Sequence, residues 1–349
     1  MPHLVGLECS FPAYCYSQEQ ISELLIQESR NKQTVIKKIH TSALVQHRAL
    51  CLPIDHYPKL TGIKERMHLW QKIALDLSYQ CINKLFKNLN FNPLDIGHFF
   101  FTSITGMSAP SLDALLVNRL KLSSSIKRTP IFGLGCLGGA ALLSRAADYL
   151  RAYPNELALV LALELCSLTY QKSDLSMANI VATGLFSDGC AALLLAGDKH
   201  PLSKNSIFKI IDSHQVFFSE SANIMGWSIE DTGFKIILSN GVPEIARVAI
   251  PHASDRFLER HQLKRENIDH WIAHPGGPKV INALEEGLGI PSNALRHTRD
   301  SLLELGNMSS VSVLNVLQRT INEKPKANEH ALLFAMGPGF CAEMVLMQC

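Results

Sequence analysis

Three segments of this chain carry side chains that could together perform thioester chemistry. Cys136 lies in the glycine-rich stretch GLGCLGG, His274 begins the stretch HPGG, and Asn307 lies in GNMSS. A cysteine thiolate can take up an acyl group. A histidine and an asparagine can donate hydrogen bonds to the oxyanion that forms when a thioester enolises or is attacked. The three segments therefore predict an enzyme that makes carbon–carbon bonds from acyl thioesters.

Most cysteines in folded proteins are buried packing residues, so the surroundings of Cys136 must argue for a catalytic role. Glycines at positions 133, 135, 138 and 139 allow a tight turn and the close approach of a ligand. A helix predicted to begin at this turn should stabilise the thiolate and lower the pKa of the thiol. Cys166, Cys190 and Cys341 are interpreted as structural, and Cys166 is expected to line a pocket as well.

His274 and Asn307 have structural alternatives that the sequence leaves open. His274 follows an apolar stretch predicted to be a strand, and α/β folds place chemistry at the carboxyl ends of strands. It could instead only cap the following turn. Asn307 could be an N-cap or a left-handed turn residue. His98 and His270 lie inside polar corners and are interpreted as structural.

The composition is that of a protein with a large core, since 47% of the 349 residues are hydrophobic and 18% are charged. A net charge of +2 gives no indication of nucleic-acid binding. The N-terminus lacks the pattern of a signal peptide, and no apolar run reaches the roughly 20 residues that span a bilayer. Nine cysteines without CxxC pairs argue against a disulfide framework or a zinc site. We therefore expect a protein of the reducing cytoplasm.

Much of the sequence pattern occurs twice. Residues 70–102 show an amphipathic helix, a polar corner and an apolar strand, and residues 249–274 repeat this order. Both polar corners contain the pattern Asp/Asn-Ile-x-His. Four further elements follow in matching order, namely predicted helices at 111–120 and 279–288 and predicted strands at 156–163 and 329–336.

This duplication predicts a layered α/β architecture. Cys136 and Asn307 take equivalent places in the two repeats, 171 residues apart, and each lies at the start of a helix. If the halves pack about a pseudo-twofold axis, these two helix starts converge at the centre. We place the boundary near residues 203–205. The N-terminal half (1–203) then carries the cysteine, and the C-terminal half (204–349) carries the histidine and the asparagine.

Taken together, these segments resemble the type III polyketide synthases, the chalcone-synthase-like branch of the thiolase-fold condensing enzymes. The resemblance extends over nearly the whole chain and implies a layered αβαβα fold of two duplicated thiolase-like halves. The stretches MGW (225–227) and TGFK (232–235) look more like the bacterial members than the plant members. Other matching stretches are TSITG (102–106), GLGCLGG (133–139), LFSDG (185–189), WIAHPGG (271–277), GNMSS (306–310) and GPGF (337–340).

The resemblance implies that Cys136 attacks a starter acyl-CoA. His274 would keep the thiolate poised and, with Asn307, hold the thioester carbonyl of malonyl-CoA. Decarboxylation then gives an enolate that attacks the acyl-enzyme, and the extended chain returns to the cysteine. The resemblance implies no cofactor beyond these CoA substrates. It also implies a homodimer with residues 103–110 at the contact, where Met107 or Ala109 reaches the partner's cavity.

The resemblance also assigns residues to the substrate pocket. Phe186 falls at the position of a gatekeeping aromatic between the CoA tunnel and the cavity, and Ile236 stands where a second aromatic of this gate usually lies. Thr169 matches a cavity-lining position, while Cys166 stands where plant members often have threonine. Arg48 either matches a basic residue that meets a CoA phosphate or is a solvated surface arginine.

The leading hypothesis is a synthase with a fatty acyl starter and an alkylpyrone or resorcinol-type product. The aliphatic residue Ile236 and an aromatic content of 7% suit an alkyl tunnel. One alternative is an initiating β-ketoacyl-carrier-protein synthase that stops after one condensation. Such enzymes usually show a glutamine and an asparagine after the histidine, and this chain has HPGG instead. The other is a catalytically silent thiolase-fold binding subunit, which conflicts with the intact Cys-His-Asn set.

Overall fold

The computed structural model describes residues 1–239 and 241–349. Its central feature is a nine-stranded sheet with the order β11-β12-β13-β8-β1-β7-β6-β4-β5. The strands from the first half are β1 (His3–Ser10), β4 (Ile96–Thr102), β5 (Lys127–Ile131), β6 (Leu157–Leu165) and β7 (Asp188–Ala196). The strands from the second half are β8 (Phe208–Phe217), β11 (His270–Ala273), β12 (His330–Gly337) and β13 (Cys341–Gln348).

The two halves of this sheet repeat one topology. In the first half β4 is parallel to β6, β6 is antiparallel to β7, and β7 is antiparallel to β1. In the second half β11 is parallel to β12, β12 is antiparallel to β13, and β13 is antiparallel to β8. The halves join where β1 meets β8, through the pairs His3–Lys209 and Leu4–Phe208. The duplication predicted from the sequence is confirmed.

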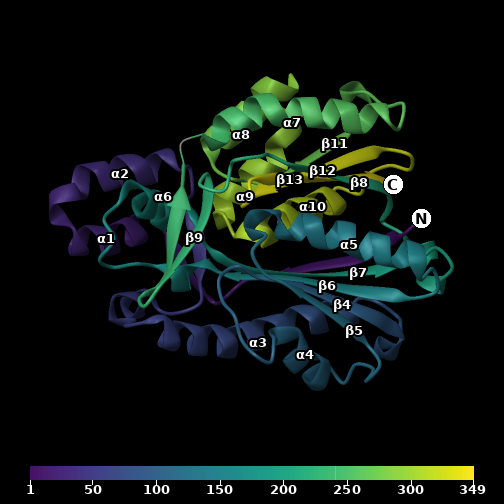
Figure 1. Ribbon diagram of the computed structural model, residues 1–349, viewed down its shortest axis with the longest axis horizontal. Coiled ribbons are helices and arrows are strands. Elements are labelled where there is room, and N and C mark those ends of the chain that lie inside the picture. Colours follow the sequence, from purple (N-terminus) through teal and green to yellow (C-terminus); the bar gives the residue numbers. More distant parts are fainter. Residues whose placement is uncertain (240) are drawn as a thin grey trace.

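Helices and strands alternate through the molecule in five layers (Figure 1). α3 and α4 cover the first half of the sheet, α5 and α10 lie between the halves, and α7 and α8 cover the second half. This is the layered αβαβα arrangement that the sequence predicts. None of the described helices is long and apolar enough to cross a membrane. The layer helices are α3 (Ile63–Lys87), α4 (Leu112–Leu120), α5 (Gly138–Ala152), α7 (Val242–Glu259), α8 (Pro278–Leu288), α9 (Arg296–Leu305) and α10 (Ser312–Asn322).

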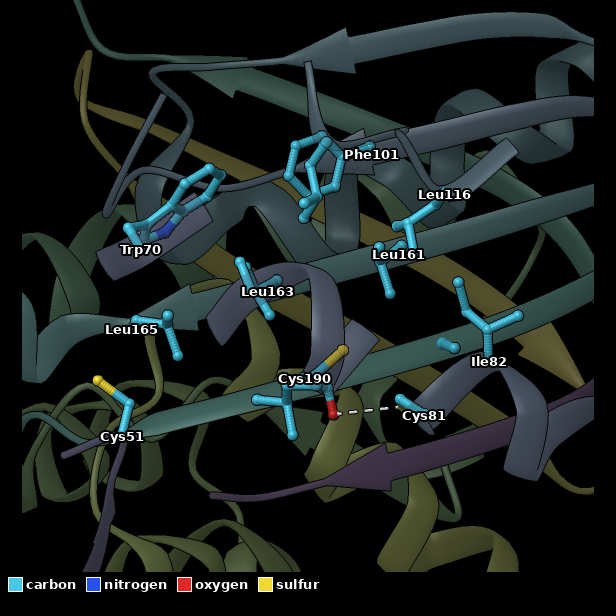
Figure 2. Close-up of a cluster of buried hydrophobic side chains, with 14 of the residues drawn as sticks. Cys51, Trp70, Cys81, Ile82, Phe101, Leu116, Leu161, Leu163, Leu165 and Cys190 are labelled. Carbon is cyan, nitrogen blue, oxygen red and sulfur yellow. Dashed lines mark hydrogen bonds between the residues drawn. The ribbon is translucent and has the colours of Figure 1, made fainter. Parts of the chain in front are cut away.

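The middle strands lie under helices on both faces, so they can be apolar throughout. Every residue of β6 and β7 is buried, which confirms the buried strand predicted at 157–163. Figure 2 shows how Trp70 and Ile82 of α3 meet sheet side chains such as Leu163 in one apolar cluster. In the same view, the Cys81 thiol donates a hydrogen bond to the backbone oxygen of Cys190 at 3.8 Å.

A smaller group of elements lies at one end of the layers, on the left of Figure 1. It contains helices and two antiparallel strand pairs that the sequence analysis did not predict, and α6 packs against α1, α2 and β10 within it. Its members are α1 (Gln18–Glu28), α2 (Gln33–Ser42), α6 (Met177–Leu185), β2 (Tyr14–Ser17), β3 (His47–Leu50), β9 (Met225–Glu230) and β10 (Gly233–Leu238). Three short 3-10 turns complete the frame used below, namely η4 (Gly135–Leu137), η6 (Pro201–Asn205) and η9 (Ser309–Val311).

The division of the chain at 203/204 remains a prediction. This position lies in η6, between the last strand of the first half and the first strand of the second half.

Candidate active site

Two helix starts bring Cys136 and Asn307 into one region. Cys136 lies in η4, which leads into α5, and Asn307 lies just before η9, which leads into α10. The turns η4 and η9 pack against each other. A Cβ atom at Gly139 would collide with the backbone oxygen of Ser310, so this approach requires a glycine. The convergence predicted from the duplicated sequence is therefore confirmed.

His274 directly follows β11, where its backbone N–H donates to the oxygen of Phe334 in β12 at 3.0 Å. The loop after it places Gly277 against the side chain of Leu185. The N–H of Asn307 donates to Leu185 O at 2.8 Å, and the N–H of Ser187 donates to Asn307 O at 2.9 Å. The segment 185–187 thus links the His274 loop to Asn307.

Burial determines the protonation of this site. Cys136, His274 and Asn307 are 6%, 4% and 2% exposed. Loss of hydration raises the pKa of Cys136 to about 12 and lowers the pKa of His274 to about 3. The free site therefore holds a neutral thiol and a neutral imidazole. The prediction that the helix start lowers the pKa of Cys136 is wrong here, because desolvation outweighs the hydrogen bond from Ser309.

Two side chains of the site are free to donate to a ligand. Neither ring nitrogen of His274 has a hydrogen-bond partner among the residues that the structure describes. Buried polar groups are normally paired, so this imidazole can serve a substrate oxygen. Asn307 Oδ1 accepts the N–H of Ser309 at 2.8 Å, which leaves Nδ2 as its donor. Two such donors can stabilise a thioester oxyanion.

Cys136 lines a cavity of about 400 Å³ together with three other predicted site residues, Cys166, Phe186 and Ile236. His274 and Asn307 do not line this cavity directly. Asn307 is linked to the cavity by Ser309, a lining residue whose backbone N–H donates to Asn307 Oδ1. The sequence analysis missed Ser309 and Trp227 as lining residues, although both lie in stretches that carry the resemblance. The lining is completed by Ile104, Gly135, Met225, Gly226, Leu238 and Pro338.

A second cavity of about 560 Å³, a volume that includes open solvent at its mouth, borders the first. Cys166, Phe186, Trp227 and Ile236 line both cavities, so these four side chains lie at the boundary. Thr169 lines only the second cavity.

Arg48 also lines the second cavity, and it is 2% exposed. The alternative of a solvated surface arginine is therefore wrong. Its guanidinium donates to the backbone oxygens of Thr183 and Phe186 and to Gln18 Oε1. A contact between Arg48 and a CoA phosphate stays a prediction.

Glu164 is a buried carboxyl group near Cys136 that the sequence analysis did not single out. It accepts hydrogen bonds from Ser310 Oγ at 2.5 Å, from Thr105 Oγ1 at 2.9 Å and from the N–H of Ile104 at 3.1 Å. Burial nevertheless raises the pKa of Glu164 to about 7. Glu164 is the one charged residue in the apolar strand β6, and this feature of the sequence could have identified it as a buried carboxyl group.

The unfolding free energy of the Glu164→Gln variant should increase relative to that of the wild type as the pH rises. The folded-state pKa of about 7 lies above the ordinary value of 4.5, so the folded protein holds this proton where the unfolded chain has lost it. The stability contribution of Glu164 therefore falls between these pH values. From about pH 5.5 to about pH 7.5, the difference in unfolding free energy should move by roughly 2 kcal/mol in favour of Glu164→Gln. Urea unfolding at both pH values checks this, and a difference independent of pH would contradict it.

The residues interpreted as structural have structural partners. His98 Nε2 bonds Thr129 Oγ1 at 2.7 Å, and His270 Nε2 lies 2.8 Å from a carboxylate oxygen of Glu329. All nine cysteines are free in this structure.

Two family models match the chain. One describes FAE1/type III polyketide synthase-like proteins and covers residues 20–222, and the other describes the C-terminal domain of chalcone and stilbene synthases and covers residues 209–349. The chain belongs to the type III polyketide synthase family. Members of this family are condensing enzymes of the acyltransferase type and use CoA thioesters. This placement removes the alternatives of a silent binding subunit and of an initiating carrier-protein synthase.

Individual relatives agree with the family models. A 1,3,6,8-tetrahydroxynaphthalene synthase of Streptomyces peucetius is 36% identical, and the match covers 99% of this chain and 92% of that one. A putative chalcone synthase of Bacillus subtilis is also 36% identical, with 99% and 98% covered. Among solved structures, the 1,3,6,8-tetrahydroxynaphthalene synthase of Streptomyces coelicolor superposes with a TM-score of 0.93 at 27% identity, with 99% of both chains covered. The thiolase-like fold of a type III synthase is thereby shown.

Proposed function

We propose that this type III synthase loads a fatty acyl group from CoA onto Cys136 and extends it repeatedly with malonyl-CoA. The extended chain then cyclises to an alkylpyrone or a resorcinol-type product. The second cavity supports the fatty acyl starter, because it borders the Cys136 cavity and offers apolar side chains to an alkyl chain. Its aliphatic lining residues are Ile21, Leu24, Leu50, Ala182 and Ile236.

Several polar groups of the second cavity are paired within the protein, whereas Tyr170 Oη and Arg48 Nε have no hydrogen-bond partner among the described residues. Thr169 Oγ1 donates to Cys166 O at 2.7 Å, and Thr183 Oγ1 donates to Asn179 O at 2.7 Å. The guanidinium of Arg48 donates to carbonyl oxygens. An alkyl chain beside Thr169 and Thr183 would leave their hydroxyl groups paired.

In the loading step, Cys136 Sγ bonds to the carbonyl carbon of the starter thioester, and CoA leaves. As Sγ attacks, His274 accepts the Sγ proton and returns it to the departing CoA thiolate. The acyl group then rests on Cys136 in a buried site, where the exclusion of water limits hydrolysis of the thioester.

In the extension step, malonyl-CoA loses carbon dioxide and leaves an enolate whose oxygen accepts hydrogen bonds from His274 and Asn307 Nδ2. The enolate carbon attacks the acyl group on Cys136, a carbon–carbon bond forms, and the Cys136 thiolate is released for the next transfer. Two N–H donors thus stabilise the enolate. We propose that no metal or redox cofactor takes part, and dialysis against a chelator should leave the rate unchanged.

Mass spectrometry of products from malonyl-CoA with a panel of acyl-CoAs, acetyl to palmitoyl, tests the proposal. Pyrones or resorcinols that carry the alkyl chain of a long starter would support it. The 36% identical 1,3,6,8-tetrahydroxynaphthalene synthase favours a second candidate, a polyhydroxylated naphthalene without an alkyl chain. A reaction with malonyl-CoA as the single donor separates the two. Absence of any product or acyl-enzyme would overturn both.

Leu24→Trp should shorten the starters that the enzyme accepts. Leu24 lines the second cavity but not the Cys136 cavity, so a larger side chain fills the space proposed for the alkyl tail and leaves the reacting groups in place. Palmitoyl-CoA turnover should fall at least about tenfold, which corresponds to a loss of roughly 1.4 kcal/mol. Butyryl-CoA turnover should stay within about twofold. A starter profile equal to that of the wild type would place the tail elsewhere.

We also propose a cytoplasmic homodimer, in which the nine free cysteines would stay reduced. β5 is the edge strand of the sheet, and Thr102 and Ile131 are paired at the ends of the parallel strands β4 and β5. The loops that follow these ends expose two apolar side chains, Met107 at 44% and Phe132 at 47%. An unpaired edge beside exposed apolar residues is suited to a second copy of the chain.

Phe132→Glu should convert this dimer to a monomer, because a carboxylate would have to be desolvated at the contact. Light scattering coupled to gel filtration measures the mass. Val35→Glu is the matched control, since Val35 is 40% exposed on α2 and should leave the mass of the wild type unchanged. A monomeric wild-type protein, or a dimeric Phe132→Glu variant, would contradict the assignment of this surface.

A further inference from the structure

The segment after α6 carries two parts of the proposed machinery. Phe186 lies at the boundary of the two cavities. On either side of it, Leu185 O and the N–H of Ser187 form the hydrogen bonds to Asn307 at 2.8 and 2.9 Å, so the two segments pair as a short parallel bridge. Any shift of this segment would move Asn307 and Phe186 together.

Arg48 and Gln18 hold this segment from outside α6. The Arg48 guanidinium donates to Thr183 O and, at 3.1 Å, to Phe186 O. Gln18 Nε2 donates to Gly184 O at 2.8 Å, and Arg48 also donates to Gln18 Oε1 at 2.5 Å. Carbonyl groups in the last turn of a helix lack helical partners, and a cation there also complements the helix dipole. The two side chains therefore close the end of α6.

The alkyl stem of Arg48 contacts the residue that precedes Asn307. Gly306 has φ of +71°, and a Cβ atom there would lie 2.9 Å from Arg48 Cγ and 2.9 Å from Leu185 O. Only glycine fits between these groups in this conformation. Arg48 thus packs against the Asn307 segment and hydrogen-bonds the Phe186 segment at the same time.

Burial favours a precise position for this side chain. Desolvation lowers the pKa of Arg48 to about 9, which still leaves the guanidinium charged at neutral pH, and Asp188 opposes the shift. Hydrogen bonds from a charged donor are stronger than neutral ones, especially away from water. A lysine keeps the charge but has no planar fork to reach several acceptors.

We propose that Arg48, with Gln18, is a positioning residue for the condensation, which sets the donor amide of Asn307 and the boundary residue Phe186. It acts through the segment 185–187 and Gly306 and not by contact with the reacting atoms. This inference rests on the proposed roles of Cys136 and Asn307.

The test measures the two half-reactions of Arg48→Met separately. The first half-reaction is decarboxylation of malonyl-CoA to acetyl-CoA, which depends on the enolate donors. The second is transfer of an acyl group to Cys136, which depends on the thiol and its proton acceptor. Mass spectrometry of the intact protein measures this transfer. The kcat of decarboxylation should fall about 10- to 100-fold with little change in KM, since small misplacements have effects of this size. Acyl transfer should stay within about threefold. Arg48→Lys should recover part of the lost decarboxylation.

Arg66→Met is the matched control. Arg66 is 3% exposed and donates to Leu168 O at 2.7 Å, but it has no hydrogen bond to the segment 185–187. Arg66→Met should lower the melting temperature but should not lower the rate of decarboxylation relative to the rate of acyl transfer. If Arg48→Met does not fold, Gln18→Ala and Arg48→Lys provide the same comparison.

The outcomes distinguish this inference from the function on which it rests. A wild-type enzyme that neither decarboxylates malonyl-CoA nor takes up an acyl group would overturn the proposed function. A wild-type enzyme with both activities, together with Arg48 variants that lower both half-reactions equally or neither, would overturn the positioning role alone.

Discussion

Cys136→Ala should abolish polyketide formation while malonyl-CoA decarboxylation continues. The acyl chain has no other attachment point in the proposed mechanism, so condensation should fall more than about 10³-fold, in line with the loss of a catalytic nucleophile. Decarboxylation needs only the enolate donors His274 and Asn307. Product analysis by mass spectrometry and acetyl-CoA release measure the two activities on one sample.

Cys166→Ala is the control for this experiment. Cys166 is 4% exposed and lines the same cavity as Cys136, so both variants open a similar space beside the substrate. Burial raises the pKa of the Cys166 thiol well above its ordinary value, and we expect this variant to keep forming product. Full product formation by Cys136→Ala would remove Cys136 from the nucleophile role.

Asn307→Asp should lower malonyl-CoA decarboxylation by about 10² to 10³, the effect of losing one oxyanion donor. Aspartate can still accept the N–H of Ser309 that Asn307 Oδ1 accepts at 2.8 Å, so the local backbone should be retained. The Nδ2 donor is replaced by an oxygen, which cannot donate and which repels the enolate. Steady-state release of acetyl-CoA gives the rate, and His274→Ala should show a loss of similar size.

A buried asparagine outside the site provides the matched control. Asn315 is 5% exposed in α10, and its Oδ1 accepts hydrogen bonds from Ser301 Oγ and Arg319 Nε. Asn315→Asp preserves both acceptor contacts and should decarboxylate at nearly the wild-type rate. If Asn307→Asp retained that rate, Nδ2 would not be a donor to the enolate, and His274 would have to stabilise it with another group.

The fold could be predicted because its signals are local and occur twice. The apolar run at 157–163 became the buried strand β6, and residues 279–288 became α8. Two copies of one order of helices and strands can bury their apolar faces only by packing on each other. The smaller elements around α6 escaped prediction, because short amphipathic pieces acquire their structure from the surfaces on which they pack.

The sequence by itself predicted the candidate catalytic residues: Cys136, His274 and Asn307 were proposed from residue type and small-residue turns, and the duplication implied that two of them meet. Only the tertiary structure decided the environment that acts on them. Burial keeps Cys136 a thiol instead of a thiolate, although its place at a helix start predicts the opposite. Folding also turns Arg48 inward onto carbonyl oxygens at the end of α6. Hydration and hydrogen bonding depend on neighbours from distant parts of the chain, so a linear pattern carries the identity of a group but not its surroundings.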